Sequence, residues 1–369
     1  MNNFSYSAAT TVDAALAQIG SFTTPASGLV AGKFIAGGTN LIDLMKENVV
    51  RPERLIDING LSLDTIEETA DGGLRLGALA RNADTAYHPL VEQRYPLLSA
   101  AILAGASPQI RNMASNGGNL LQRTRCYYFY DTGVPCNKRE PGTGCPAISG
   151  LARQHAILGT SEHCIATHPS DMCVALAALD ATVVVQSPRG VRQIPFGEFH
   201  RLPGDRPDLD NTLAADELIL HIELPPGARF AGHSAYLKLR DRASYAFALV
   251  SAAAALDVDD GGRICAARIA LGGVAHKPWR DPAVETQLVG QLASAAVFAR
   301  AAAVLLEGAT AYGVGPGSNA FKIDMARRAV VRALETALLG TVRNTGKDQL
   351  GHENRADPAD PTGNEEYTA

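Results

Sequence analysis

Cysteine is the residue type in this sequence with the most potential for chemistry, and four of the six cysteines fall close together. They are Cys126, Cys136, Cys145 and Cys164, with nine, eight and eighteen residues between neighbours. Four thiolates can hold an iron–sulfur cluster or a zinc ion, and four thiols can form two disulfides. Structural zinc sites usually contain a cysteine pair separated by roughly two to four residues. Because no such pair occurs here, zinc fits less well, but the spacing leaves all three interpretations open.

The other two cysteines, Cys173 and Cys265, lie in an apolar helix pattern and an apolar strand pattern, so we expect them to be structural. Four consecutive aromatic residues, Tyr127–Tyr130, directly follow Cys126. They belong to a stretch, residues 122–161, that is dense in Cys, Pro and Gly and has little helical or strand periodicity. We expect a long inserted loop here, and ordered loops of this length are usually functional. The aromatic side chains would pack this loop and exclude solvent from a cluster.

A glycine pair lies in Ala36-Gly37-Gly38-Thr39-Asn40-Leu41, between a strand predicted at residues 34–36 and a helix predicted at residues 41–46. Glycines let a backbone approach a ligand closely, and Thr39 or Asn40 can cap the helix. The free N–H groups at a helix start favour an anion such as a pyrophosphate. A tight turn with a helix cap explains the same residues, so both interpretations stay open.

A second glycine pair, Asn116-Gly117-Gly118-Asn119, follows an apolar helix predicted at residues 97–104. Two such loops in one chain favour contact of both with one extended ligand. A third element is His168-Pro169-Ser170-Asp171, where Ser170 or Asp171 can cap an Ala-rich helix predicted at residues 172–179. Capping alone would also explain this third element.

The motifs of several other catalytic classes are absent from the sequence. It has no Walker loop and no Gly-x-Gly-x-x-Gly, so P-loop or Rossmann binding is disfavoured. It also lacks a nucleophile elbow, a His-Glu-x-x-His helix and the kinase motifs. The nine histidines are scattered, and we expect each alone to be structural or exposed rather than catalytic. A redox cofactor, rather than side chains, would therefore supply the chemistry.

The elements that must position these residues change in type along the chain. Residues 1–56 have the pattern of βα units, and hairpins are predicted at residues 66–78 and 182–194. Farther on, long strands are predicted at residues 235–258 and 263–271, and Ala-rich helices at residues 293–306 and 320–339. These last elements have the pattern of a separate α+β domain.

Length, composition and charge limit the class of protein further. At 369 residues the chain exceeds the ~250–300 residues at which one core stops growing, so two or three packed units are expected. The 46% apolar and 19% charged residues are typical of a globular protein. The net charge of −5 argues against a nucleic-acid partner, and no apolar stretch approaches the ~20 residues that span a bilayer. We therefore expect no membrane anchor and no export signal, and we expect residues 344–369 to form an acidic solvated tail.

Together these elements resemble the FAD-binding subunit of the molybdenum hydroxylases, the xanthine dehydrogenase and aldehyde oxidoreductase family, over about residues 4–339. Residues 242–245 and 270–275 are similar to the signature of that family's C-terminal domain. The resemblance implies an α+β fold, in which a PCMH-type FAD-binding fold of two subdomains precedes a C-terminal α+β domain like that of the CO dehydrogenase flavoprotein.

The resemblance also implies that FAD binds through the two Gly-Gly loops, with Asp171 on the flavin side and Lys238 near the ring. The implied cofactor-binding residues are Ile35, Ala36, Gly37, Gly38, Thr39, Asn40, Leu41, Ser115, Gly117, Gly118, Asn119, Asp171 and Lys238. No catalytic residue is implied on this chain.

The cysteine-bearing insertion makes the chain resemble, more specifically, the periplasmic aldehyde oxidoreductase type, whose flavin subunit also holds a [4Fe–4S] cluster. The matching runs are Gln122-Arg123-Thr124-Arg125-Cys126, Pro135-Cys136-Asn137-Lys138-Arg139, Gly144-Cys145 and residues 162–171. The resemblance thus implies that Cys126, Cys136, Cys145 and Cys164 are the ligands of a [4Fe–4S] cluster. It implies no role for the acidic tail.

The implied domains are FAD-binding subdomains at residues 1–60 and 61–226, with the iron–sulfur insertion at about 122–166, a C-terminal flavoprotein domain at 227–343 and the tail at 344–369. The implied function is electron transfer within a heterotrimer. A molybdenum-cofactor subunit would oxidise an aldehyde, a small [2Fe–2S] subunit would pass the electrons on, and FAD here would deliver them to an acceptor. A partner with an export signal would carry the chain to the periplasm, or else the complex would stay in the cytoplasm.

Three alternatives stay open beside this function. One is a stand-alone flavin oxidase with the same PCMH-type FAD-binding fold, which would need a general base near the flavin ring. A second is the flavin subunit of an enzyme that reduces hydroxybenzoyl thioesters. The third is a scaffold protein without enzymatic activity that is stabilised by a structural zinc ion and would be colourless.

Overall fold

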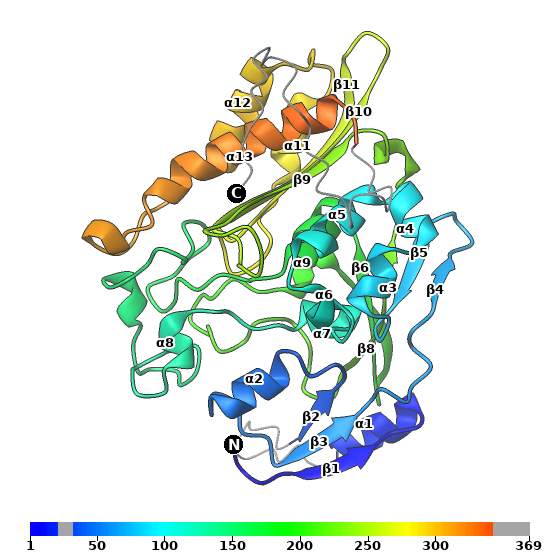
Figure 1. Ribbon diagram of the computed structural model, residues 1–369, viewed down its shortest axis with the longest axis vertical. Helices are drawn as coiled ribbons and strands as arrows, with labels where there is room; N and C mark the ends of the chain where they lie inside the picture. Colours follow the sequence, from blue (N-terminus) through cyan, green and yellow to red (C-terminus); the bar gives the residue numbers. More distant parts are fainter. Residues whose placement is uncertain (21–31, 342–369) are drawn as a thin grey trace, which may run out of the picture.

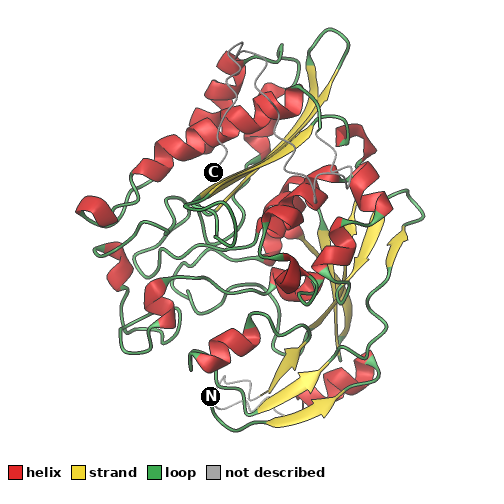
Figure 2. Ribbon diagram, viewed as in Figure 1, coloured by secondary structure: helices red, strands yellow, loops and turns green. Residues whose placement is uncertain are grey.

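The structure, a computed structural model, describes residues 1–20 and 32–341 and divides this part of the chain into three units joined by a long irregular segment (Figure 1). The first unit lies at the bottom of Figure 1 and the third at the top, with the second between them. Each unit combines helices with a sheet (Figure 2), which confirms the predicted α+β class.

The first unit is built on a three-stranded parallel sheet with the order β1-β3-β2. Its elements are β1 (Ser5–Ala8), α1 (Val12–Gly20), β2 (Gly32–Ile35), α2 (Leu41–Lys46) and β3 (Arg54–Asp57). Leu16, Ile19 and Ile56 are buried in its core. Because all three strands run in parallel, their carboxyl ends lie at one edge of the sheet. The first Gly-Gly loop leaves β2 at that edge and leads into α2.

The second unit holds a five-stranded antiparallel sheet with the order β4-β5-β8-β6-β7. Its strands are β4 (Ile66–Glu68), β5 (Leu74–Gly77), β6 (Thr182–Ser187), β7 (Gly190–Pro195) and β8 (Leu218–Leu224). Both predicted hairpins are confirmed by the β4–β5 and β6–β7 pairs. The helices are α3 (Asn82–Ala86), α4 (Pro89–Arg94), α5 (Pro96–Ala104), α6 (Pro108–Arg111), α7 (Asn116–Leu120), α9 (Asp171–Ala178) and α10 (Phe196–Phe199).

The segment between α7 and α9 is irregular, as predicted for residues 122–161, apart from the short helices α8 (Tyr127–Tyr130) and η1 (Pro146–Ile148). The aromatic residues Tyr127–Tyr130 have different surroundings. Phe129 is fully buried and packs in a cluster with Leu44 of α2, Tyr128 packs on a separate apolar cluster, and Tyr127 is 49% exposed. The aromatic side chains therefore do pack the inserted segment.

The third unit is an antiparallel sheet with the order β11-β10-β9, covered by helices. Its elements are η2 (Ala228–Phe230), β9 (Ser234–Leu239), β10 (Val250–Val258), β11 (Ile264–Gly272), α11 (Pro282–Leu288), α12 (Ala295–Leu305), η3 (Gly315–Gly317) and α13 (Phe321–Leu338). Among the described helices, none combines the length and the apolar character that crossing a bilayer requires. The predicted tail, residues 344–369, lies outside the described residues.

One strand prediction was wrong. Residues 235–258 form two strands rather than one, because the chain reverses through a loop at residues 240–249 and β9 pairs antiparallel with β10. β10 is buried on both faces, since Ala253 and Ala255 pack in the core of the second unit while Ala252 and Ala254 pack in the core of the third. A strand buried on both sides shows no alternation in sequence, so its pattern merged with that of β9.

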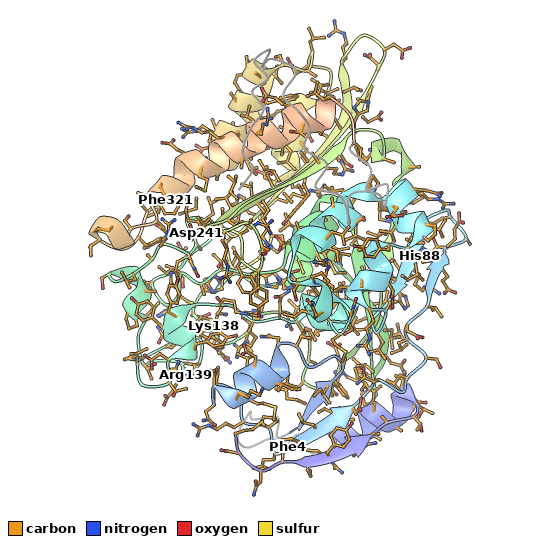
Figure 3. The ribbon with its side chains drawn as sticks, viewed as in Figure 1. Phe4, His88, Lys138, Arg139, Asp241 and Phe321 are labelled. Atoms are coloured by element: carbon orange, nitrogen blue, oxygen red, sulfur yellow. The ribbon has the colours of Figure 1, made fainter. Side chains whose placement is uncertain are left out.

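Arg153 and Arg280 fasten the parts of the chain to one another. Arg153, in the inserted segment, pairs with Asp241 at 2.7 Å and lies over the ring of Phe321 at 4.8 Å. Figure 3 shows Asp241 and Phe321 near each other at the start of α13. Arg280, before α11, binds both carboxylate oxygens of Glu285 at 2.7 and 2.8 Å and donates to the carbonyl of Ala177 in α9 at 2.6 Å.

Replacing Arg280 by Met should lower the free energy of unfolding. The Glu285 carboxylate is only 5% exposed and would lose its main partner, which for a buried pair costs about 3–5 kcal/mol. Arg268 remains 3.7 Å from Glu285, so we expect a smaller loss of about 2 kcal/mol. Urea unfolding followed by far-UV circular dichroism measures this difference.

Arg327→Met is the matched control, because Arg327 pairs with Asp324 at 2.8 Å on an exposed face of α13. Its loss should be about 0.5 kcal/mol or less. Equal destabilisation by the two substitutions would contradict the role of Arg280 at the boundary between units.

Candidate functional site

The first Gly-Gly loop, residues Ile35, Ala36, Gly37, Gly38, Thr39, Asn40 and Leu41, connects β2 to α2. Gly38 has a φ of +71°, a conformation that side-chain-bearing residues rarely adopt. A Cβ on Gly37 would lie 1.9 Å from the carbonyl oxygen of Met113. Asn40 occupies the cap position of α2, but it makes no capping bond, and its Oδ1 accepts from the N–H of Arg123 at 2.9 Å instead. Asn40 therefore ties this loop to the inserted segment rather than capping the helix.

The second glycine pair forms a helical turn, α7, rather than an open loop. Ser115 caps it, with its Oγ accepting from the N–H of Gly118 at 3.3 Å. The N–H of Gly117 donates to the carbonyl of Ala78 at 2.8 Å, and a Cβ on Gly117 would lie 3.2 Å from Ala78. The absence of side chains here thus lets α7 pack closely against the end of β5.

The two glycine pairs lie against each other, because Met113, which closes on Gly37, stands two residues before Ser115. Arg81 and Asn59 hold this contact. Arg81 donates to the carbonyl of Met113 at 2.7 Å and to Oδ1 of Asn59 at 3.2 Å, and Asn59 donates to the carbonyl of Ala36 at 3.1 Å. The sequence reasoning missed both residues, and no local motif marks them.

The second loop also connects to the start of α9. Oδ1 of Asn119 accepts from the hydroxyl of Ser170 at 2.5 Å. The Oγ of Ser170 in turn accepts from the N–H of Cys173 at 3.0 Å, which confirms the predicted cap of α9. Asn119 and Ser170 therefore hold α7 and α9 in a fixed relation.

Asp171 follows this cap, and its carboxylate is occupied by two donors. The hydroxyl of Tyr236 binds Oδ1 at 2.7 Å, and the ammonium of Lys238 binds Oδ2 at 2.8 Å. Lys238 also donates to the carbonyl of Ala104 at 3.0 Å, and its side chain is 4% exposed. The two predicted residues are thus brought together as a buried ion pair between the second and third units.

A cavity opens beside Asp171, where the second unit, the third unit and the inserted segment meet. It is lined by residues 124–126, 154–155, 167–171, Phe247, Ala248, Ser251 and 272–273. Of the residues predicted to bind the cofactor, only Asp171 is in this lining. The second Gly-Gly loop connects to this lining through Asn119, which binds Ser170, and the first connects through Asn40, which binds Arg123 next to Thr124 in the chain. We call this space the larger cavity.

Arg125 supplies a positive charge to the larger cavity. Its guanidinium lies over the ring of Phe247 at 4.9 Å and donates to the carbonyl of Arg123, and no carboxylate pairs with it in the described part of the chain. Burial lowers its pKa from the usual value. The larger cavity therefore combines an apolar ring, backbone polar groups and a cation with no salt bridge among the described residues, a lining suited to a flat, partly anionic ligand.

The four predicted thiols line one smaller cavity, which we call the thiol cavity. The structure thus brings together Cys126, Cys136, Cys145 and Cys164, although up to 38 positions separate them. All six cysteines are free thiols, so the disulfide interpretation has no counterpart among the described residues. Cys173 is buried in α9 and Cys265 is exposed on β11, and neither is in the lining of the thiol cavity.

The protonation of the thiols depends on their mutual contact and on burial. Burial raises the pKa of Cys126 to about 12. A hydrogen bond between Cys145 and Cys164 lowers the pKa of Cys145 to about 6, and the same bond together with burial raises the pKa of Cys164. Thiolates gathered in a buried space need a bound cation to compensate their charge, so the donor set suits a metal centre.

Charged residues beside the thiol cavity form a buried network. Lys138 lines the thiol cavity, and its ammonium binds the carboxylate of Asp210 and the carbonyl of Pro207. Arg123 pairs with the same carboxylate. Although burial alone would raise the pKa of Asp210, the two cations hold it well below its usual range. Figure 3 shows Lys138 and Arg139 on the inserted segment. Because two cations share the one carboxylate of Asp210, the network has a net positive charge near the thiols.

Histidines gather around both cavities, which the scattered sequence positions did not indicate. His155, His168, His200 and His276 are all buried, and the rings of His168 and His200 lie 4.2 Å apart. Burial lowers the pKa of His155 and of His200 to about 4. His155 and His168 line the larger cavity, and His155 also lines the thiol cavity.

Comparisons with known proteins agree with this arrangement. Residues 2–227 match the FAD binding domain in molybdopterin dehydrogenase, and residues 234–337 match the CO dehydrogenase flavoprotein C-terminal domain. The chain is 51% identical to the aldehyde oxidoreductase FAD-binding subunit PaoB of Escherichia coli (strain K12), over 83% of this chain and 91% of the relative. It is 28% identical to the carbon monoxide dehydrogenase medium chain of Hydrogenophaga pseudoflava, over 90% of this chain and 96% of the relative.

Among solved structures, a carbon monoxide dehydrogenase from Hydrogenophaga pseudoflava matches with a TM-score of 0.70 and 26% identity, covering 92% of this chain and 98% of that one. These matches confirm the predicted fold of an FAD-binding part followed by a flavoprotein C-terminal domain. The chain belongs to the FAD-binding medium subunits of the molybdenum hydroxylase family and is an oxidoreductase subunit.

Proposed function

We propose that this chain is the FAD- and [4Fe–4S]-binding electron-transfer subunit of a molybdenum-dependent aldehyde oxidoreductase. The observation that carries the proposal is the placement of four free thiols around one buried cavity directly beside the larger cavity. The similarity to an aldehyde oxidoreductase subunit supports the aldehyde as substrate class. Relatives described as medium chains and medium subunits support a heteromeric complex with a molybdenum subunit and a small [2Fe–2S] subunit.

The two Gly-Gly loops and the lining of the larger cavity, which we together call the FAD cradle, fit FAD. The glycine pairs bring two backbone segments into contact, and Asp171 and Arg125 stand where the second and third units meet. The residues that would hold FAD are those of the two loops together with Asp171, while Lys238 would act by holding Asp171. When bound, FAD would supply the exchange of single electrons and electron pairs. The chain's own part is to bind FAD, to orient it and to exclude water.

The thiol cavity fits an iron–sulfur cluster better than zinc. The four cysteines lack the close pair of most structural zinc sites. The positive charge of the network formed by Lys138, Arg123 and Asp210 would compensate part of the negative charge of a cluster with four thiolates. The ligands would be Cys126, Cys136, Cys145 and Cys164.

Replacing any one of these four cysteines by Ser should lower the iron content of the purified chain by more than half. A cluster loses much of its binding energy with one thiolate, and the inserted segment would lose one of its anchors. Iron and sulfide analysis, together with the visible absorption spectrum, measures the loss.

Cys265→Ser is the control, since Cys265 is exposed and distant in sequence from the thiol cavity. It should retain the iron of the parent protein. Equal iron loss in the control would contradict the ligand assignment, and zinc in place of iron in the parent protein would favour the zinc interpretation.

Gly37→Val should reduce FAD binding at least tenfold. Any side chain at this position collides with the carbonyl of Met113, so the two glycine pairs would have to separate. Gly197→Val is the control, because a Cβ at Gly197 meets no atom within 4 Å. Flavin absorbance after purification and FAD titration of the apoprotein measure binding. A Gly37→Val protein that purifies fully yellow would contradict this cradle.

The isolated chain should not oxidise aldehydes. Oxidation at a C–H bond needs a transfer site with its own acid or base, and we assign this site to the molybdenum subunit. Dithionite should nevertheless reduce the isolated chain, and an artificial acceptor should reoxidise it, as followed by flavin absorbance. Aldehyde oxidation by this chain without its partners would favour a stand-alone flavin oxidase.

A further inference from the structure

The larger cavity and the thiol cavity share part of their lining. Among the described residues, Cys126 and His155 are common to the two linings. Cys126 is one of the four thiols proposed as cluster ligands, whereas His155 belongs to none of the sequence motifs. His155 therefore stands at the boundary between the two proposed cofactor sites.

His155 makes a direct contact with the sulfur of Cys126. Its Nε2 lies 3.0 Å from the Sγ, and the residue is 2% exposed. This distance is short for a contact to sulfur, so the imidazole points its nitrogen at the thiol. The thiols of Cys136, Cys145 and Cys164 have no recorded contact with a histidine among the described residues.

The backbone of His155 is fixed from three sides. Its N–H donates to the carbonyl of Ala152 at 2.8 Å. Its carbonyl accepts from the ammonium of Lys322 at 2.8 Å and from the amide of Asn319 at 3.2 Å. Lys322 and Asn319 are both fully buried in the third unit. The third unit thus fixes the backbone of His155, even though the inserted segment that contains it is irregular.

The direction of the hydrogen bond follows from the chemistry of a metal-bound thiolate. A cysteine bound to iron carries no proton on sulfur, so its Sγ can only accept a hydrogen bond. The Nε2–H of a neutral imidazole is then the donor, and Nδ1 carries the lone pair. Nδ1 is buried and has no hydrogen-bond partner among the described residues, which is compatible with this tautomer.

We propose that His155 is a positioning residue that sets the reduction potential of the cluster through an Nε2–H···Sγ hydrogen bond to Cys126. The inference rests on the proposed function, because it requires that Cys126 be a cluster ligand. A hydrogen bond to a ligand sulfur stabilises the more negative, reduced cluster more than the oxidised cluster, so it raises the potential. Cys126 is also the one proposed ligand among the four thiols that lines the larger cavity, so the bond would act on a ligand shared by the two proposed sites.

The test compares His155→Leu with His155→Gln in the assembled enzyme. Leu removes the donor, whereas the amide nitrogen of Gln can take the place of Nε2. The cluster potential, measured by redox titration with EPR detection, should fall in His155→Leu and stay near the parent value in His155→Gln. Iron and FAD content are measured in the same samples, so that only loaded proteins are compared.

His88→Leu is the matched control, since His88 lines neither cavity and its ring only accepts from the N–H of Leu90 at 3.3 Å. Its cluster potential should equal that of the parent. If His155→Leu fails to retain iron, His155→Asn replaces it, because the Asn amide is too short to reach Sγ.

The inference is overturned if a loaded His155→Leu or His155→Asn protein keeps the parent potential. It is also overturned if His155→Gln shifts the potential as much as His155→Leu does. Absence of iron from the parent protein is a different result, and it would contradict the proposed cluster itself.

Discussion

The buried ion pair between Asp171, which lines the larger cavity, and Lys238 joins the second and third units beside that cavity. The Asp171 side chain is 7% exposed and that of Lys238 is 4% exposed, so removal of either partner would leave a charge without compensation in a buried interface. The pair joins the first turn of α9 to β9, and Lys238 also holds the end of α5. Three elements from two units, α5, α9 and β9, are therefore joined through this one ion pair.

The second and third units are also joined by an apolar contact, and the inserted segment is attached to both the first and the third unit. Because β10 is buried on both faces, the second and third units share one continuous apolar contact rather than touching at their rims. The inserted segment lies against these units and is fastened to them by polar contacts from several sides. Arg153 binds the third unit, Lys138 binds the loop that contains Asp210, and Asn40 of the first unit binds the segment's backbone. The thiols thus acquire fixed positions although their own segment has little core.

Local features of the fold could be predicted from the sequence, whereas contacts between distant positions could not. The helix at residues 41–46, the two hairpins and the cap at Ser170 depend on neighbouring residues, and all are confirmed. The four cysteines were predicted to act together because they cluster in sequence, and they line one cavity.

The features that were missed depend on pairing across long separations. Arg81 reaches Met113, and Lys138 reaches Asp210, with no local pattern to indicate either contact. Asn40 had the right type for a cap, yet the N–H of Arg123 occupies its side-chain oxygen instead. His155 was missed because a single histidine carries no signal until its distance to a sulfur is known.

The hydrogen bond between Ser170 and Asn119 has a consequence for how this architecture can change in evolution. It closes the inserted segment at its base, because α7 ends and α9 begins at this contact. When extra residues are inserted between two positions that are already in contact, the main cost is the entropy of closing the loop. This cost rises by only about 0.6 kcal/mol for each doubling of the loop length. The chain between α7 and α9 can thus be a long segment or a short turn without displacing either helix. An ancestor could have gained the cysteine-bearing segment, and a descendant could lose it, while the FAD cradle kept its shape.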